Sequence, residues 1–169
     1  VTGNIEDISF NNQILKKIKI FGQVKDQVFD GKLTLNDPNL KLDFNGLIDY
    51  SNDLIDFDFN SSIKFANLFN LGFNDNGILN GDFIVKLRGN NMKDLIGDLT
   101  LQKIKYQNID RTIEFKDLYA QLRNNEGNRI INISSEDIVS GILIGEYDFI
   151  NLRSSVLNNF GKHYSNYKL

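Results

Sequence analysis

The sequence predicts an all-β fold, in which a mainly antiparallel sheet follows a long, curled meander. Three observations support this prediction: apolar and polar residues alternate along most of the chain, turn residues lie between the alternating runs, and glycines recur in the apolar series. Alternation places one set of side chains on a buried face and the other in water. It is typical of antiparallel sheets, because strands of parallel sheets are usually apolar on both faces.

Composition limits the classes of protein that this chain can represent. Its 169 residues are 41% hydrophobic and carry a net charge of −3, with acidic and basic residues interspersed. This size suits one folded domain with a core. Because no stretch is strongly basic, nucleic acid is not an expected partner. The apolar runs are too short to cross a bilayer, and the lack of cysteine fits a reducing compartment or a bacterial periplasm alike.

No change of composition divides the chain, so we expect one domain over residues 1–169. The pattern is regular at both ends, which predicts a section of a longer protein. The spacing of the alternating runs is close to that of a meander. The expected strands cover residues 4–11, 14–25, 28–36, 40–50, 54–65, 78–88, 96–107, 112–123, 129–137 and 141–149.

Turn residues separate these strands. Asp37-Pro38-Asn39 divides two strands, Asn76-Gly77 suits a tight hairpin turn, and residues 124–128 are typical of a longer hairpin loop. The alternation changes phase near Lys103–Ile104 and again near Lys116–Leu118. Because a bulge inserts one extra residue into a strand, both places are expected to be β-bulges.

Two segments depart from period two and predict short helices. The first covers residues 66–71, with Gly72 at its C-terminal end. The second covers residues 151–161, where apolar residues have helical spacing and Asn151 suits the N-cap position. We expect residues 151–169 to form a C-terminal helix and tail that cover an end of the sheet.

Glycine recurs inside a short pattern of apolar, any, glycine, any, apolar. Glycine in a strand costs about 0.5–1 kcal/mol relative to alanine, so its repetition needs a reason. One explanation is that the glycines let the sheet curl toward its apolar face. The other is that some of them, as in Asp30-Gly31 and Asn80-Gly81, are hairpin residues. The pattern occurs at residues 20–24, 29–33, 44–48, 79–83, 95–99 and 139–143.

The residues do not predict an enzyme. His163 is the single histidine and cysteine is absent, which argues against a zinc site or a Cys/His nucleophile pair. Asp56 and Asp58 lie two apart in a strand, where a solvated face explains them best. Residues 74–77 resemble part of a calcium loop but lack its spaced ligands, so they are interpreted as a turn. No cofactor or metal is expected.

The candidate site is the apolar series of the four central strands. In a β-sandwich these side chains would form a closed core, as in an adhesin-like or carbohydrate-binding module. In a curled single sheet they would line an open groove. An outer-membrane barrel would need aromatic girdles at the strand ends, which are not evident. The series consists of Leu40, Leu42, Phe44, Ile48, Ile55, Phe57, Phe59, Ile63, Phe65, Phe83, Val85, Leu87, Leu99 and Leu101.

Longer motifs resemble a known family. Residues 29–46 contain Asp-Gly-Lys-Leu followed by Asp-Pro-Asn-Leu-Lys-Leu, and residues 81–97 and 157–167 add weaker support. Together they resemble the TamB translocation and assembly module of the AsmA-like superfamily, most closely its Bacteroidetes branch. The resemblance covers most of the chain, as an internal fragment of such a protein.

The resemblance implies a fold and a function. Proteins of this family form a long, β-taco-like hydrophobic groove, are anchored in the inner membrane and span the periplasm. They are linked to phospholipid transport and to outer-membrane protein assembly, with an Omp85-class barrel protein as partner. The apolar series would then be a lipid groove that contacts phospholipid acyl chains, and adjoining segments of the same long chain would extend it.

Overall fold

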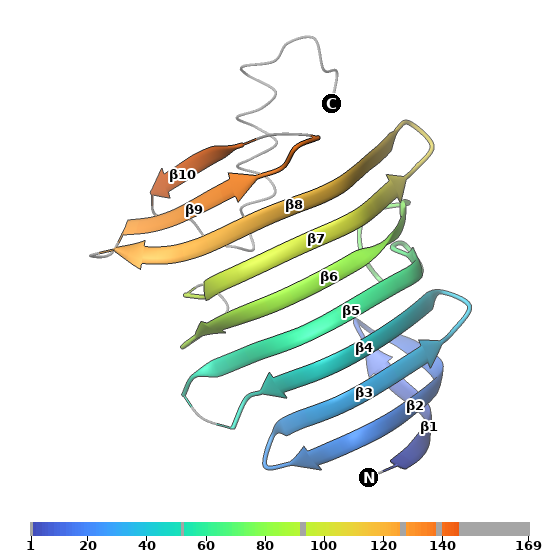
Figure 1. The fold of residues 1–169 in the computed structure, drawn as a ribbon. Coiled ribbons are helices and arrows are strands. Elements are labelled where there is room, and N and C mark those ends of the chain that lie inside the picture. The colour runs from blue at the N-terminus through green and yellow to red at the C-terminus, as the bar shows by residue number, and fades with distance from the viewer. Residues whose placement is uncertain (1, 52, 92–93, 126–127, 138–139, 146–169) are drawn as a thin grey trace.

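The protein forms one open, antiparallel sheet of ten strands, each paired with its neighbours in sequence (Figure 1). A computed structural model describes residues 2–51, 53–91, 94–125, 128–137 and 140–145. The predicted all-β, antiparallel class is therefore confirmed for the described residues. The strands are β1 (Thr2–Phe10), β2 (Gln13–Lys25), β3 (Val28–Asn36), β4 (Leu40–Asp49), β5 (Ile55–Asn67), β6 (Ile78–Gly89), β7 (Ile96–Gln107), β8 (Thr112–Asn125), β9 (Asn128–Ser134) and β10 (Gly141–Gly145).

The predicted helix over residues 66–71 is wrong. Ala66 and Asn67 end β5, and only a single turn follows, in which the Leu71 N–H donates to the Asn67 carbonyl at 3.0 Å. Gly72 ends that turn with a φ of 82°. Ala66 is buried and pairs with Leu79 of β6, so sheet pairing outweighs local helix preference here. The predicted helix at 151–161 lies outside the described residues.

The described part of the chain contains no helix that is long and apolar enough to span a membrane.

Two of the connections between strands differ in length from what was predicted for them. The turn predicted at Asp37-Pro38-Asn39 lies between β3 and β4. The Asp37 carboxylate stabilises it by accepting hydrogen bonds from the backbone N–H groups of Asn39 at 2.8 Å and Lys16 at 2.9 Å. Residues 68–77 form one long connection, so Asn76-Gly77 is not a tight hairpin turn. The β8–β9 pairing continues to Asn125 and Asn128, so that connection is shorter than predicted.

Bulges occur at one predicted position and at one that was missed. The β6–β7 register shifts beside Lys103, which has a φ of 50°, as predicted. The β7–β8 register is unchanged along β8, so the predicted irregularity at 116–118 is not a register shift. In β5 the register shifts between Ile63 and Ala66, where no bulge was predicted.

Glycines lie in register where β2, β3 and β4 approach closely. Gly22 pairs with Gly31, which pairs with Gly46. A Cβ atom on Gly22 would lie 2.3 Å from the carbonyl oxygen of Asp30, and one on Gly46 would lie 2.3 Å from that of Asp58. The glycines therefore occupy strand interiors and permit close backbone contact, so hairpin chemistry does not explain them.

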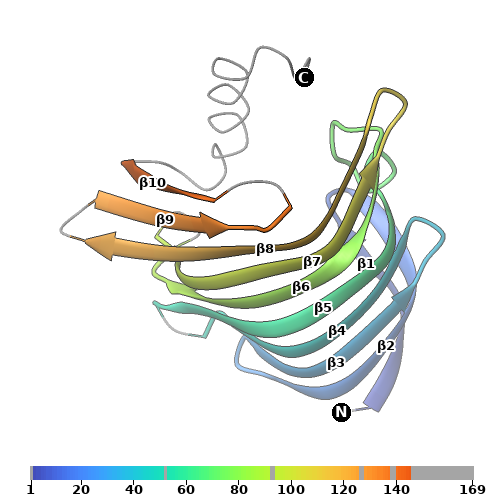
Figure 2. The same cartoon turned by 45° about the horizontal axis from the view of Figure 1, so that its top comes forward.

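The sheet curves strongly, with β1 and β2 folded back toward the middle strands (Figure 2). Two groups of buried side chains lie on one face. The first cluster joins β2, β3, β5 and the 68–77 connection, and the second joins β5 to β9. The first cluster is Leu15, Ile18, Leu35, Ala66 and Leu71. The second cluster is Phe57, Val85, Leu87, Leu95, Ala120, Leu122 and Ile131.

Candidate functional site

The predicted apolar series lies on one face of the sheet, with a single exception. Paired residues of antiparallel strands point to the same side, so the register assigns each residue to a face. Leu42 pairs with Ile63, and Phe59 pairs with Val85. The same reasoning along β4 to β7 places every predicted residue except Phe65 on this apolar face.

Phe65 points to the opposite face. It pairs with Lys41, whereas its neighbour Ala66 pairs with Leu40 of the apolar series. The bulge between Ile63 and Ala66 causes this reversal, because one extra residue inverts the alternation that follows it. Phe65 is therefore removed from the set of candidate lining residues.

Exposure differs along the apolar face. Phe57, Val85 and Leu87 are 8–9% exposed and belong to the second cluster. The other lining residues are half-buried. Of these, Ile48, Ile55, Phe59, Phe83 and Leu99 pack against the second cluster, and Leu40, Leu42 and Ile63 pack against the first cluster. Side chains of the face thus cover one another partly, while most of the predicted residues retain some exposure.

The apolar face extends beyond the predicted series of residues. Ile18 of β2 pairs with Leu35 of β3, and Leu122 of β8 pairs with Ile131 of β9. All four are at most 3% exposed. The period-two signal was present in these strands, and it could have been used to extend the candidate site across the sheet.

A row of aromatic rings crosses the apolar face beside the glycines. Ring centroids are 5.6 Å apart for Phe29 and Phe44, 4.8 Å for Phe44 and Phe59, and 6.3 Å for Phe57 and Phe59. Phe59 lies directly opposite Gly46. Aromatic side chains next to a strand glycine cover backbone that would otherwise be bare, so these rings form a continuous apolar surface.

Charged side chains occupy the other, polar face. Lys103 and Asp82 pair at 3.6 Å, and Lys64 forms an ion pair with Asp43. The hydrogen bond from Lys64 is the main reason that the pKa of Asp43 lies below its usual value. Exposed pairs of this kind contribute little to stability, but they keep the polar face hydrated, and the two faces of the sheet remain chemically distinct.

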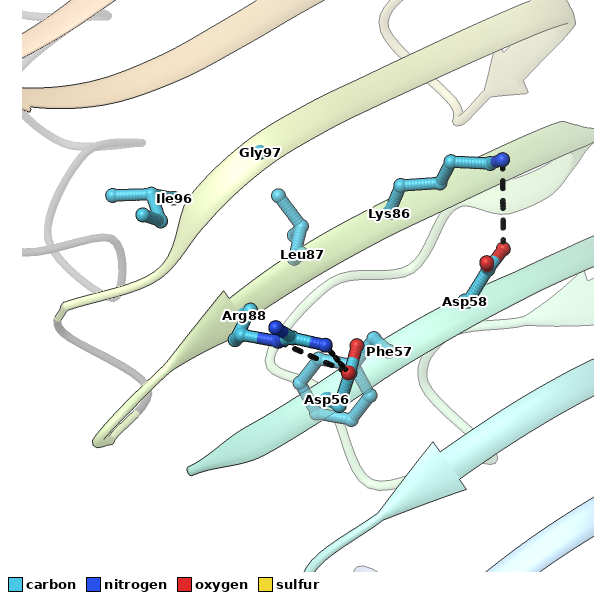
Figure 3. A pocket seen from close by; sticks show the side chains of 8 residues that line it. All are labelled: Asp56, Phe57, Asp58, Lys86, Leu87, Arg88, Ile96 and Gly97. Atoms are coloured by element: carbon cyan, nitrogen blue, oxygen red, sulfur yellow. Dashed lines mark hydrogen bonds and ion pairs between the residues drawn. The ribbon is translucent and has the colours of Figure 1, made fainter. Parts of the chain in front are cut away.

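A shallow hollow of about 250 Å³ lies on the polar side, near Gly97 (Figure 3). Asp56 binds Arg88 there, and Lys86 lies 3.9 Å from Asp58. These aspartates are thus on the solvated face, as predicted, and are compensated by basic neighbours. Within the described ranges no group of three or more potential metal ligands occurs.

The comparisons with known proteins identify no relative. No family model, no curated protein and no solved structure matches the chain. The two-faced sheet itself and the motifs of the sequence are therefore the features that bear on function.

Proposed function

We propose that the chain is a section of a β-taco-like groove that carries phospholipid acyl chains between the inner and outer membranes. The observation that carries this proposal is an apolar sheet face on which, in the described part of the chain, no second sheet is packed. All strands of the described residues belong to one sheet, whereas a sandwich module would need two. An open face of this kind is available to a guest molecule.

The physical gain from such a face is large. Moving an acyl chain through water costs about 0.8 kcal/mol per CH₂ group, or about 12 kcal/mol for a sixteen-carbon tail. Contact with the apolar face would remove much of this cost, while the headgroup stays in water. Apolar contacts have no preferred direction, so a chain can slide along the row of Phe29, Phe44 and Phe59 without a deep minimum.

The resemblance of the sequence motifs to the TamB family suggests where in the cell this section would act. The section would be part of an inner-membrane-anchored protein in the periplasm, with no catalytic role of its own. Adjoining segments of the same chain would continue the sheet, and an Omp85-class barrel would be the partner at the outer membrane. Phospholipid transport and outer-membrane protein assembly are the two processes that this arrangement would serve.

Lipid crosslinking tests the proposal. Phe44→Arg places a charge on the apolar face and should abolish labelling by a photoactivatable phospholipid, because the guanidinium is costly to desolvate. Asn45→Arg is the matched control, since Asn45 is the exposed neighbour on the polar face, and it should label normally. Circular dichroism establishes that both variants stay folded.

Two results would contradict the proposal. One is equal labelling of the Phe44→Arg and Asn45→Arg proteins. The other is the absence of copurified phospholipid when the wild-type protein is analysed by mass spectrometry under native conditions.

A further inference from the structure

The β1–β2 turn touches the β5–β6 connection, although β3 and β4 separate these elements in the sheet. The Asn11 side-chain amide donates a hydrogen bond to the Leu71 carbonyl at 3.1 Å. The rings of Phe10 and Phe73 lie with centroids 6.3 Å apart. These residues connect the edge of the sheet to its middle and hold the curl in place at this end. We call this contact the clasp.

Gly72 shows how closely the two elements fit together. Its φ of 82° suits glycine. A Cβ atom at this position would lie 2.7 Å from both the carbonyl oxygen and the side-chain nitrogen of Asn11. The absence of a side chain at Gly72 therefore leaves the space that Asn11 occupies in the clasp.

The clasp lies over the most deeply buried part of the apolar face. Leu15, Ile18 and Leu35 are 1–3% exposed, and Leu71, whose carbonyl accepts the Asn11 bond, is 3% exposed. No guest can contact these side chains while the clasp is closed. The half-buried residues of β4 to β7, by contrast, keep part of their surface free.

Of the two strands of the edge hairpin, β1 is the more exposed. In the described structure β1 pairs with β2 alone, and most of its residues are exposed. At the tip, the clasp adds the Asn11–Leu71 hydrogen bond and the contact between the exposed rings of Phe10 and Phe73, whereas Leu15 and Ile18 of β2 are buried in the first cluster. Opening the hairpin therefore exposes buried apolar side chains, and the cost of this exposure falls when an apolar guest covers them.

We propose that the clasp is a gate, which must open before a phospholipid acyl chain can reach the first cluster. This inference rests on the proposed function. Opening swings the β1–β2 hairpin away from the 68–77 connection and exposes Leu15, Ile18 and Leu71. The acyl chain then replaces the contacts that these side chains lose. In the closed state, the same contact shields this part of the face from water.

A crosslink that holds the clasp closed tests the gate. The chain has no cysteine, so a Phe10→Cys/Phe73→Cys protein can be bridged specifically with dibromobimane. Uptake is measured from vesicles of phosphatidylethanolamine and phosphatidylglycerol that contain a pyrene-labelled phospholipid. The bridged protein should lose most of its uptake, whereas the same protein without the bridge should take up lipid at least as fast as wild type.

A second variant opens the clasp. Asn11→Ala should raise the open fraction about fivefold, the change expected when one ordinary hydrogen bond is lost. Spin labels at Gln13 and Phe69 would then report a longer distance. Asn12→Ala is the control, because Asn12 has a similar positive φ in the same turn but lies outside the clasp.

The outcomes separate the two proposals. If wild type takes up lipid and the bridge has no effect, the gate is wrong and the proposed function stands. If wild type takes up none, the proposed function fails and the gate fails with it. An unchanged spin-label distance in Asn11→Ala would also overturn the gate.

Discussion

At the scale of single residues, the curvature depends on positions that exclude a side chain. Gly46 has a φ of 146°, and a Cβ atom there would lie 2.5 Å from the Cα of Phe59 on the next strand. Any L-residue would therefore separate β4 from β5 or distort both. The ring of Phe59 instead covers the space beside the glycine.

Gly46→Ala should lower the free energy of unfolding by about 3 kcal/mol, because the added methyl group overlaps backbone atoms that cannot move independently. Gly3→Ala is the control, since nothing lies within 4 Å of a Cβ atom at Gly3. Urea unfolding of both variants measures the difference. Equal stability of the two variants would show that the strands do not approach closely at Gly46.

A hydrogen bond on the polar face lowers the pKa of Asp98. Tyr119 donates to Asp98 at 2.6 Å, and this bond is the main reason that the pKa of Asp98 lies below its ordinary value. Because the folded pKa is depressed, the stabilisation is present above the unfolded value of about 3.9 and is lost as the pH falls through the folded value.

Tyr119→Phe should therefore raise the pKa of Asp98 toward its usual value, as measured by NMR titration of the carboxyl carbon. Tyr106→Phe is the control, because Tyr106 donates its hydrogen bond to Asp75 instead. An Asp98 titration that is the same in the Tyr119→Phe and wild-type proteins would contradict the role of this bond.

At the scale of elements, the 68–77 connection belongs to the core although it is not a strand. A hydrogen bond from the Leu68 N–H to the Gly77 carbonyl at 3.0 Å joins its two ends, and the Leu71 side chain between them is buried in the first cluster. Local sequence favours a helix here. The last residues of β5 pair with β6 instead, and the connection becomes a loop that covers one end of the apolar face.

Leu71→Ala should destabilise the protein by about 2–4 kcal/mol, as expected for a leucine removed from a core. Phe69 lies in the same connection but is 62% exposed, so Phe69→Ala should change stability by less than about 0.5 kcal/mol. Thermal and urea unfolding compare the two variants. Equal effects would place Leu71 outside the core.

At the scale of the whole molecule, stability is unevenly distributed because the fold is a single layer. The strands β5 to β7 are paired on both sides and carry much of the second cluster. Among the described residues β1 is paired on one side only. The edge should therefore open without unfolding the centre, which is the behaviour that the clasp requires.

Hydrogen–deuterium exchange should show this difference in stability between the central strands and the edge strand. Amides of β5 to β7 should exchange slowest, and those of β1 should exchange fastest among the strands compared, because local opening frees them. The Asn11→Ala variant should speed exchange in β1 and β2 alone. Uniform protection across the sheet would indicate that the molecule unfolds only as a unit.

Much of this molecule could be predicted from local patterns. Period-two alternation located the strands and nearly all of the apolar face, because side-chain direction in a strand depends only on position in the chain. Phe65 was assigned to the wrong face, because a bulge depends on how the neighbouring strands pair. The helix expected at 66–71 failed for a related reason, since Ala66 gains more from burial opposite Leu79 than from a helical turn.

The sequence by itself determined that this chain would be a two-faced antiparallel sheet, because alternation, turn residues and strand glycines are local features that can be identified without knowing the tertiary contacts. The tertiary structure alone decided that the described strands stay in a single layer, and that Asn11 of the edge hairpin reaches Leu71. Both features depend on contacts between residues that are far apart in the chain, and local periodicity carries no information about such contacts. For the same reason, the sequence predicted the lining of the apolar face but not the clasp.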